Sequence, residues 1–207
     1  MTDLDGFILA GGSASRMGKR KDLLTLGGKS FIARAREALM PVTGGRVVVV
    51  GNIDSDECGR LGLRIIADIE IANAENSTRR ASIIGLFTAL SYSTTSWAAV
   101  LACDLPFVSS SLFTRIAEFC TDNCDAIVPV QPDGRLQPLC ALYRRETCVP
   151  VIKTRLIGNN WSLNGLLDQL RIRSVKFEEI SDLAGAEQFF VNINTQEDHE
   201  LAGRLES

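Results

Sequence analysis

The sequence predicts an α/β protein with a single doubly wound, mostly parallel sheet, and with residues 1–207 forming one domain. The first observation is that short apolar runs alternate along the chain with longer stretches of helical periodicity. The second is that these runs are continuously apolar, which is typical of strands covered by helices on both faces. The third is that no repeat or Pro/Gly/Ser-rich linker divides the 207 residues, a length that suits one domain.

The first strand is expected at 6–10, where the sequence reads GFILA. Further strands are expected at 46–50, 63–68, 97–103, 125–130, 138–143, 173–180 and 189–194. Helices are expected at 31–40, 81–93, 109–120, 147–156, 164–170 and 195–205. Serines from 109 onward and Thr195 are suited to cap helix N-termini, whereas Pro150 weakens the helix that contains it. The polar stretch 74–80 is expected to be a surface loop.

Composition and charge exclude several classes of protein. Lys and Arg number 22 and Asp and Glu number 25, so the net charge of -3 gives no reason to expect a nucleic acid or an anionic membrane as partner. The N-terminus lacks a basic signal-peptide region, and no apolar stretch is long enough to span a bilayer. We therefore expect a cytoplasmic protein. The six cysteines are expected to be reduced core thiols, because Cys120 and Cys124 lack the second ligand pair of a zinc site.

Ligands of open α/β sheets bind beyond the carboxyl ends of the strands. This rule selects three places in the sequence: the loop after strand 6–10, Asp104 after strand 97–103, and the asparagines of 192–194. The only histidine, His199, falls in the polar part of the last helix and is expected at the surface. Trp161 and Phe107 are expected to pack rather than to stack on a ligand ring.

The loop at 9–21 has the composition of a polyphosphate site. Gly11 and Gly12 leave the backbone N–H groups accessible to an anion, while Arg16 and Lys21 supply positive charge. The spacing excludes both the Walker A loop and the G-x-G-x-x-G fingerprint. A plain glycine turn followed by solvated cations is the alternative interpretation.

A longer pattern is more specific than the loop by itself. It runs from Leu9 to Lys29 and reads L-A-G-G-x-x-x-R-M-G-x-x-K-x-L-L-x-L-x-G-K. It resembles the signature of nucleotidyltransferases that act on sugar and pterin phosphates, and most of all that of the molybdenum cofactor guanylyltransferases, a MobA-like family. VLACDLPF (100–107), GRLQPLCALYRR (134–145), SLNGLLDQL (162–170) and FFVNINTQED (189–198) are similar to later family segments, in the same order. The resemblance implies a Rossmann-like nucleotidyltransferase fold over nearly the whole chain.

The resemblance also implies a reaction and its components. The terminal phosphate of molybdopterin would attack the α-phosphorus of Mg-GTP, pyrophosphate would leave, and molybdopterin guanine dinucleotide would form. Proteins that synthesise or insert the cofactor would be partners. The matched positions would contact the nucleotide (Leu9, Ala10, Gly11, Gly12, Asn52, Asp68), neutralise phosphate charge (Arg16, Lys21), bind Mg²⁺ (Asp104) and lie near the acceptor or the metal (Asn192, Asn194).

Four of these residues also have plain structural interpretations. Asp104 could form a turn before Pro106, Asp68 and Asn52 could be solvated turn residues, and Asn194 could cap the last helix. The absence of a histidine near these positions fits a phosphate acceptor, because a phosphate monoester is already largely ionised at neutral pH and needs no strong base.

Two departures from the family pattern concern the nucleotide. Arg20 occupies the place of the usual Asp before the motif Lys, and RASIIG stands where G-P-L-x-G is usual, with only Gly85 kept. The Gly11–Gly12 doublet resembles the guanine-using branch. The alternatives are transfer from CTP or to another phosphorylated small molecule, and a non-catalytic nucleotide-binding module. A Rossmann-type oxidoreductase is disfavoured by the missing glycine fingerprint.

Overall fold

The computed structural model describes residues 3–10, 24–51, 56–71 and 78–205, with the backbone alone for 78–81. Seven strands of these residues form one sheet in the order β5-β4-β1-β6-β8-β7-β9. The strands are β1 (Leu4–Leu9), β4 (Val47–Val50), β5 (Arg64–Ile66), β6 (Trp97–Ala102), β7 (Ala126–Pro129), β8 (Cys140–Arg144) and β9 (Ile172–Val175). Only β8 runs antiparallel to its neighbours in this sheet, so the predicted mostly parallel α/β fold is confirmed.

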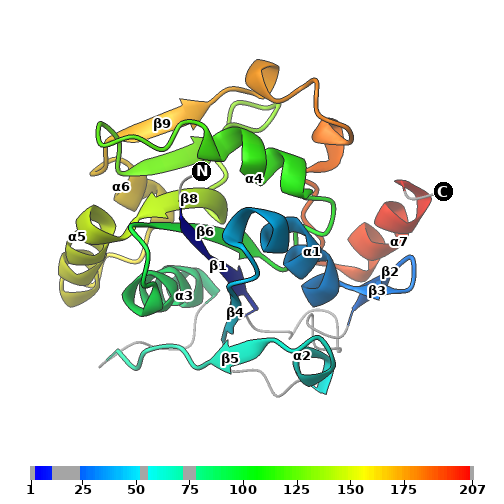
Figure 1. Cartoon of the computed structure of the whole chain (residues 1–207), viewed down its shortest axis with the longest axis horizontal. Helices are drawn as coiled ribbons and strands as arrows, with labels where there is room; N and C mark the ends of the chain where they lie inside the picture. Colours follow the sequence, from blue (N-terminus) through cyan, green and yellow to red (C-terminus); the bar gives the residue numbers. More distant parts are fainter. Residues whose placement is uncertain (1–2, 11–23, 52–55, 72–77, 206–207) are drawn as a thin grey trace.

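Helices cover both faces of the sheet, as continuously apolar strands require. Figure 1 shows α1 (Phe31–Thr43) beside α4 (Ser110–Ala117), and α3 (Thr78–Tyr92) beside α5 (Arg145–Ile157). Each pair packs on its own hydrophobic cluster: Leu39 and Phe113 belong to one, Leu86 and Ile152 to the other. The sheet residues Ile8 and Phe7 are adjacent in β1 and point into these two different clusters. The sheet is therefore doubly wound.

Local signals explain where α1 begins and ends. The Ser30 hydroxyl accepts a hydrogen bond from the Ala33 N–H, which caps the helix N-terminus. Gly44 follows the helix with φ of 60°, a left-handed conformation that glycine adopts at little cost, and its N–H donates to the Met40 carbonyl. The helix continues through Pro41 to Thr43, three residues beyond the predicted end.

Several short elements were not predicted. They are the hairpin β2 (Thr25–Leu26) and β3 (Lys29–Ser30), α2 (Asp56–Arg60), and the 3-10 turns η3 (Phe177–Glu179) and η4 (Ala186–Gln188). The predicted α6 (Leu163–Leu167) and α7 (Gln196–Leu205) are present. The hairpin and α7 share a third hydrophobic cluster, which contains Leu24, Leu26, Phe31, Ile193 and Ala202.

Four expectations are corrected by the structure. The strand expected at 173–180 ends at Val175, and Phe177–Glu179 form a 3-10 turn instead. Residues 189–194 are not a strand: Phe189 and Phe190 are both buried rather than alternating, and the segment packs outside the sheet. Residues 78–80 belong to the first turn of α3 rather than to a loop. Pro150 does not interrupt α5, which runs from Arg145 to Ile157.

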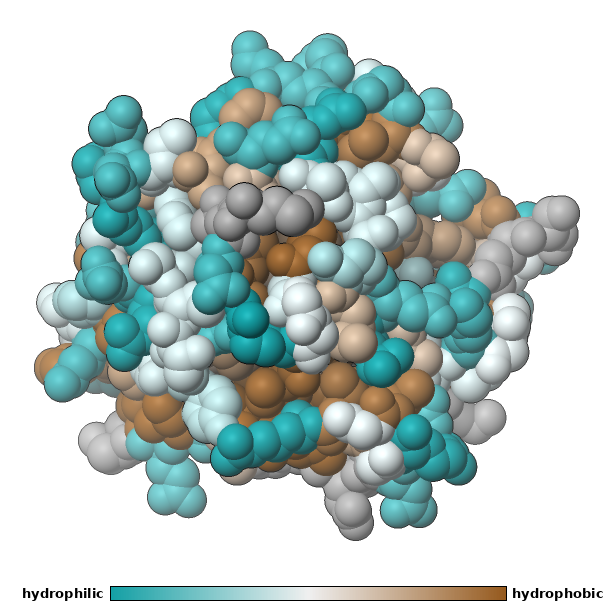
Figure 2. Space-filling view, viewed as in Figure 1, coloured by the Kyte–Doolittle hydropathy of each residue, from teal (hydrophilic) through white to brown (hydrophobic). Residues whose placement is uncertain are grey.

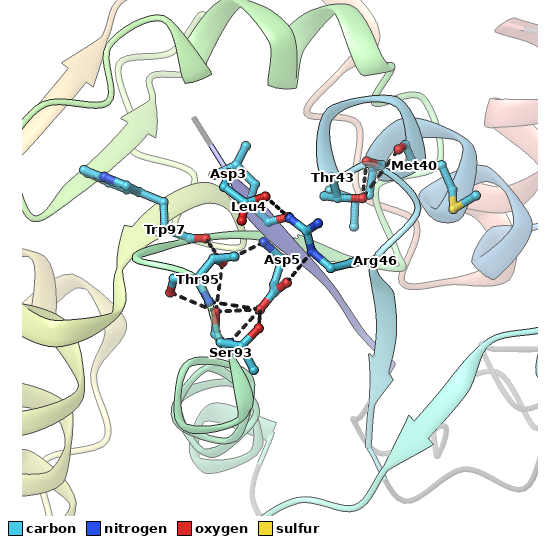
Figure 3. Close-up of polar contacts among 11 residues, drawn as sticks. Asp3, Leu4, Asp5, Met40, Thr43, Arg46, Ser93, Thr95 and Trp97 are labelled. Carbon is cyan, nitrogen blue, oxygen red and sulfur yellow. Dashed lines mark hydrogen bonds and ion pairs between the residues drawn. The ribbon is translucent and has the colours of Figure 1, made fainter. Parts of the chain in front are cut away.

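A polar network ties together the amino end of the sheet (Figure 3). The buried Asp5 carboxylate accepts hydrogen bonds from the Thr94 N–H at 2.6 Å, the Ser93 hydroxyl at 3.1 Å and the Arg46 Nε at 2.9 Å. These contacts join β1 to the residues that precede β4 and β6. Burial raises the pKa of Asp5, but its hydrogen bonds to Thr94, Arg46 and Ser93 outweigh burial and leave the pKa below its ordinary value.

The six cysteines form no disulfides, and all but Cys120 are buried. Burial raises the pKa of the Cys148 thiol to about 12, so this thiol stays protonated at neutral pH. On the face in Figure 2, hydrophobic surface gathers in the lower part of the view, on the side where β5 forms the sheet edge. Ile69, which follows β5, is the exposed large hydrophobic residue of that segment, with 37% of its surface accessible. No helix in the described ranges is both long and apolar enough to cross a bilayer.

Candidate active site at the carboxyl edge of the sheet

Backbone hydrogen bonds bring the carboxyl ends of four parallel strands to one edge. The Ala10 N–H donates to the Val50 carbonyl at 2.9 Å, and the Cys103 N–H donates to the Leu9 carbonyl at 3.1 Å. The Gly51 N–H continues the row with a 3.0 Å bond to the Ile66 carbonyl. Gly51 has φ of 143°, which lies in the region that favours glycine, so the chain can turn away directly after β4. The segments that follow β1, β4, β5 and β6 therefore start side by side.

Asp68 lies on this edge, two residues after β5. Its Oδ1 is buried and has no hydrogen-bond partner among the described residues. Burial raises the pKa of the Asp68 carboxyl above its ordinary value. A Cβ built on Gly85 of α3 would lie 3.7 Å from Asp68 Oδ1 and 3.7 Å from Leu9 Cδ2. The Asp68 carboxylate and the Leu9 side chain thus both lie next to Gly85, and a buried acceptor without a hydrogen bond suits a ligand N–H.

The position of Asp68 depends on a residue that the sequence did not single out. The Thr88 hydroxyl, buried within α3, accepts a 2.9 Å hydrogen bond from the Ile69 N–H. This bond fixes the chain directly after Asp68 against the helix that carries Gly85. A lone threonine inside an apolar helical stretch was the available signal, and by itself it does not distinguish a solvent-facing hydroxyl from an anchoring one.

Asp104 follows β6 at the same edge and is half-buried. Its carbonyl accepts a 3.0 Å hydrogen bond from the Ile193 N–H. This contact brings the C-terminal asparagines to the Asp104 turn, although they lie almost ninety residues away in the sequence. Two of the three places selected by the strand-end rule are therefore adjacent.

Asn192 and Asn194 lie on one exposed face of an extended segment, with Ile193 buried between them. The Asn194 Nδ2 donates to the Asn192 Oδ1 at 2.7 Å, so the two amides point the same way, as predicted. The first residue before α7 is Thr195, and its hydroxyl accepts from the Asp198 N–H at 3.1 Å. Thr195 therefore provides the predicted cap, and the Asn194 side chain donates a hydrogen bond to that of Asn192.

Leu9 is buried and Ala10 is half-buried at the end of β1. Gly11, Gly12, Arg16, Lys21 and Asn52 lie outside the described residues. Their expected roles stay predictions. Phe107 and Trp161 pack against hydrophobic clusters, as expected. His199 is only partly exposed, and its Nε2 lies 2.7 Å from the Thr25 carbonyl oxygen.

The groups beside the Asp104 turn are hard oxygen donors: the Asp104 carboxylate and the amide carbonyls of Asn192 and Asn194. Within the described ranges, no group of three or more His, Cys, Asp or Glu side chains could by itself hold a metal ion. Such a donor set does not suit zinc. It fits Mg²⁺, which takes one or two carboxylates and completes its shell with phosphate oxygens and water.

Solved structures share this architecture across the whole chain. Molybdopterin-guanine dinucleotide biosynthesis protein A from Archaeoglobus fulgidus superimposes with a TM-score of 0.75 at 23% identity, covering 97% of both chains. The 2-C-methyl-D-erythritol 4-phosphate cytidylyltransferase of Thermus thermophilus gives a TM-score of 0.67 at 16% identity, covering 99% of this chain and 98% of the other. The fold is that of the α/β nucleotidyltransferases, with the candidate site at the expected edge of the sheet.

The family model for the MobA-like NTP transferase domain matches residues 6–172. The chain therefore belongs to the MobA-like family of nucleotidyltransferases, and it is an enzyme of that class. A probable molybdenum cofactor guanylyltransferase from Bacillus anthracis is 30% identical over 199 residues, which cover 96% of this chain and 95% of the relative. A second protein of that description, from Carboxydothermus hydrogenoformans, is 30% identical over 200 residues, covering 97% of this chain and 95% of the relative.

Proposed function

We propose that this enzyme transfers GMP from Mg-GTP to the terminal phosphate of molybdopterin. The family, and the description of the relatives that match nearly the whole chain, support a molybdopterin substrate. The choice of nucleotide rests on one observation. The buried Oδ1 of Asp68, beside Gly85 and Leu9, has no hydrogen-bond partner among the described residues. Guanine presents adjacent N1–H and N2–H₂ donors to such a carboxylate. Cytosine presents one amino group next to a ring nitrogen lone pair, which a carboxylate repels.

In the proposed reaction, a terminal phosphate oxygen of molybdopterin attacks the α-phosphorus of GTP. The new oxygen–phosphorus bond replaces the bond to the bridging oxygen between the α- and β-phosphorus, and pyrophosphate leaves with that electron pair. No proton must be removed from an ionised phosphate acceptor. The enzyme's contribution is to align the two anions and to offset their charge.

We assign each task to residues of this chain. Backbone N–H groups after β1, with Arg16 and Lys21, would bind the triphosphate. Asp104 would hold Mg²⁺, which supplies positive charge to the phosphate oxygens, and the Asn192 and Asn194 amides would orient the acceptor phosphate or a metal-bound water. A cytoplasmic location and contacts with cofactor-synthesising or cofactor-inserting proteins stay predictions from the sequence.

The test begins with thermal unfolding in Mg²⁺ together with GTP, CTP, ATP or NAD. A ligand at ~100 times its dissociation constant stabilises the fold by ~3 kcal/mol, so GTP should raise Tm by several degrees and NAD should not. Incubation with molybdopterin and each nucleotide should then give a guanine dinucleotide and pyrophosphate, detected by mass spectrometry. Transfer from CTP at the higher kcat/KM would overturn the choice of base. Nucleotide binding without transfer to molybdopterin would overturn the acceptor.

A further inference from the structure

The C-terminal segment 191–199 reaches the candidate site without the support of a sheet ladder. Its position depends instead on three sets of contacts, each of which joins it to a different part of the edge. We refer to residues 191–199 as the C-terminal latch.

The first set holds the latch to the Asp104 turn. Ile193 is fully buried, and its N–H donates to the Asp104 carbonyl at 3.0 Å. Its side chain packs in the third hydrophobic cluster with Leu24 and Phe31. Displacing Ile193 would both break a hydrogen bond to the metal-site turn and open an apolar cluster.

The second set stiffens the latch internally. One oxygen of Asp198 accepts hydrogen bonds from the Asn194 N–H at 2.9 Å and the Thr195 N–H at 2.8 Å. The Thr195 hydroxyl accepts from the Asp198 N–H in return, at 3.1 Å. The backbone that presents the two asparagine amides is therefore fixed to the first turn of α7.

The third set connects that turn to the β2–β3 hairpin. The Thr25 carbonyl can only accept, so the His199 Nε2 at 2.7 Å is the donor. The imidazole centroid also lies 6.1 Å from that of Phe31, at the start of α1. His199 is thus a polar link between α7 and the hairpin.

We propose that the latch positions Asp104 and the Asn192–Asn194 pair for catalysis. In this proposal His199 is the positioning residue, and it keeps the latch in place through its hydrogen bond to the Thr25 carbonyl. His199 touches no substrate in this proposal, and its effect passes through the backbone of Ile193. The catalytic consequence rests on the proposed function, whereas the structural coupling of His199 to Ile193 does not.

The test compares three variants with the wild type. His199→Phe keeps an aromatic ring beside Phe31 but lacks the donor. His199→Gln restores an N–H donor on a side chain of similar reach. Glu200→Ala changes the next, exposed residue of α7, which accepts an exposed hydrogen bond from Gln196 of the same helix at 3.3 Å, and is the matched control.

Amide hydrogen exchange measures the coupling without any substrate. In His199→Phe, exchange of the peptide that contains the Ile193 amide should be about fivefold faster, the effect of losing one hydrogen bond of ordinary strength. The Gln variant and the Glu200→Ala control should exchange like the wild type. Unchanged exchange in His199→Phe would overturn the coupling.

Steady-state kinetics measures the catalytic consequence. In His199→Phe, kcat should fall and the Mg²⁺ concentration for half-maximal rate should rise, each about fivefold, while the KM for GTP stays within about twofold. The Gln variant should recover both values. A lower Tm with wild-type kcat and Mg²⁺ dependence would overturn the positioning role. A wild-type enzyme that transfers no nucleotide would refute the proposed function instead, and the exchange result would still decide the coupling.

Discussion

At the scale of single residues, Asp68 has an environment unlike that of a surface carboxylate. Its buried oxygen is unmet, and burial raises its pKa. We expect Asp68→Asn to raise the KM for GTP about tenfold or more, because a charged hydrogen bond of ~1.5–3 kcal/mol is lost. Affinity of the wild type for GTP should increase as pH rises through the raised pKa, and the variant should lose that dependence. Equal KM values for GTP would rule out the contact.

The same shift has a stability consequence of defined sign. Because the folded pKa of Asp68 lies above the ordinary value of 3.8, the folded state retains a proton that the unfolded state has lost. Stability therefore falls as pH rises from about that value through the folded pKa. Without nucleotide at neutral pH, Asp68→Asn should be at least as stable as the wild type in urea. Loss of GTP affinity with retained stability would identify a ligand-binding role.

Asp104 makes a separate prediction at this scale. Its carbonyl contact with the Ile193 N–H uses the backbone, so Asp104→Asn leaves that contact in place while removing the anionic metal ligand. We expect the Mg²⁺ concentration for half-maximal rate to rise about tenfold or more, since Mg²⁺ prefers carboxylate to amide oxygens. Activity is followed across a Mg²⁺ titration at saturating GTP. An unchanged titration curve would exclude Asp104 as the metal ligand.

At the scale of elements, α3 brings Gly85 next to Asp68 and Leu9 at the carboxyl ends of the strands. A Cβ there would meet Asp68 Oδ1 and Leu9 Cδ2 at 3.7 Å, which is ordinary contact, so Gly85→Ala fits the free protein. Alanine is favoured over glycine inside a helix by ~1 kcal/mol, so the variant should unfold at a slightly higher urea concentration. It should nevertheless raise the KM for GTP, because the methyl group fills the space beside the carboxylate. A stabilised variant with unchanged KM would place the base elsewhere.

The elements also show how far the sequence could predict this fold and site. The central strands were predictable because both faces are buried, as for Val49 and Val100, which makes each run continuously apolar. The segment 189–194 is also rich in aromatic and β-branched residues, but Phe189 and Ile193 pack in different clusters, so their burial comes from tertiary packing rather than from a sheet. No local pattern distinguishes these two sources of burial.

The sequence predicts the candidate-site residues that directly follow strands, but it does not predict the contacts that join these segments to one another. Asp68 and Asp104 follow apolar strands, and the topology of a parallel sheet places such residues at one edge. The Ile193–Asp104 contact, the Thr88 anchor and the His199–Thr25 link join segments that are distant in the sequence. Their residue types are ordinary for helices and loops, so only the three-dimensional arrangement shows what they hold.

At the scale of the whole molecule, the buried aspartate oxygens at the carboxyl and amino ends of the strands differ in their hydrogen bonding. At the carboxyl ends of the strands the buried oxygen of Asp68 has no hydrogen-bond partner among the described residues, whereas at the amino ends Asp5 accepts hydrogen bonds from two segments, at Arg46 and at Ser93 and Thr94 (Figure 3). A buried carboxylate oxygen without a hydrogen bond reduces the stability of the free protein and is available to a ligand. A carboxylate that already accepts several hydrogen bonds contributes stability and is not available. Under the proposed function, stability and nucleotide binding would depend on opposite ends of the sheet's strands.

The last prediction concerns the contribution of Asp5, at the amino end of β1, to the stability of the fold. Hydrogen bonds from Thr94, Arg46 and Ser93 hold the pKa of Asp5 below 3.8 in the folded state despite burial. Its contribution is therefore fully present above the unfolded value and is lost as pH falls through the folded one. Asp5→Asn should lower stability at pH 7 by ~2 kcal/mol, or about 4–8 °C in Tm, because several donors lose a charged acceptor.

Urea unfolding at pH 7 and pH 3 measures this effect, and the difference between Asp5→Asn and the wild type should shrink at the lower pH. Asp133→Asn is the matched control: Arg135 also lowers the pKa of the Asp133 carboxyl, but this pair lies on an exposed turn, where an ion pair contributes little. The control should unfold like the wild type.

If Asp5→Asn and Asp133→Asn had equal midpoints at pH 7, the amino-edge network would not be a source of stability. If instead Asp5→Asn loses stability but keeps the wild-type KM for GTP, the two edges act independently, because Asp5 lies at the far end of β1 from Leu9.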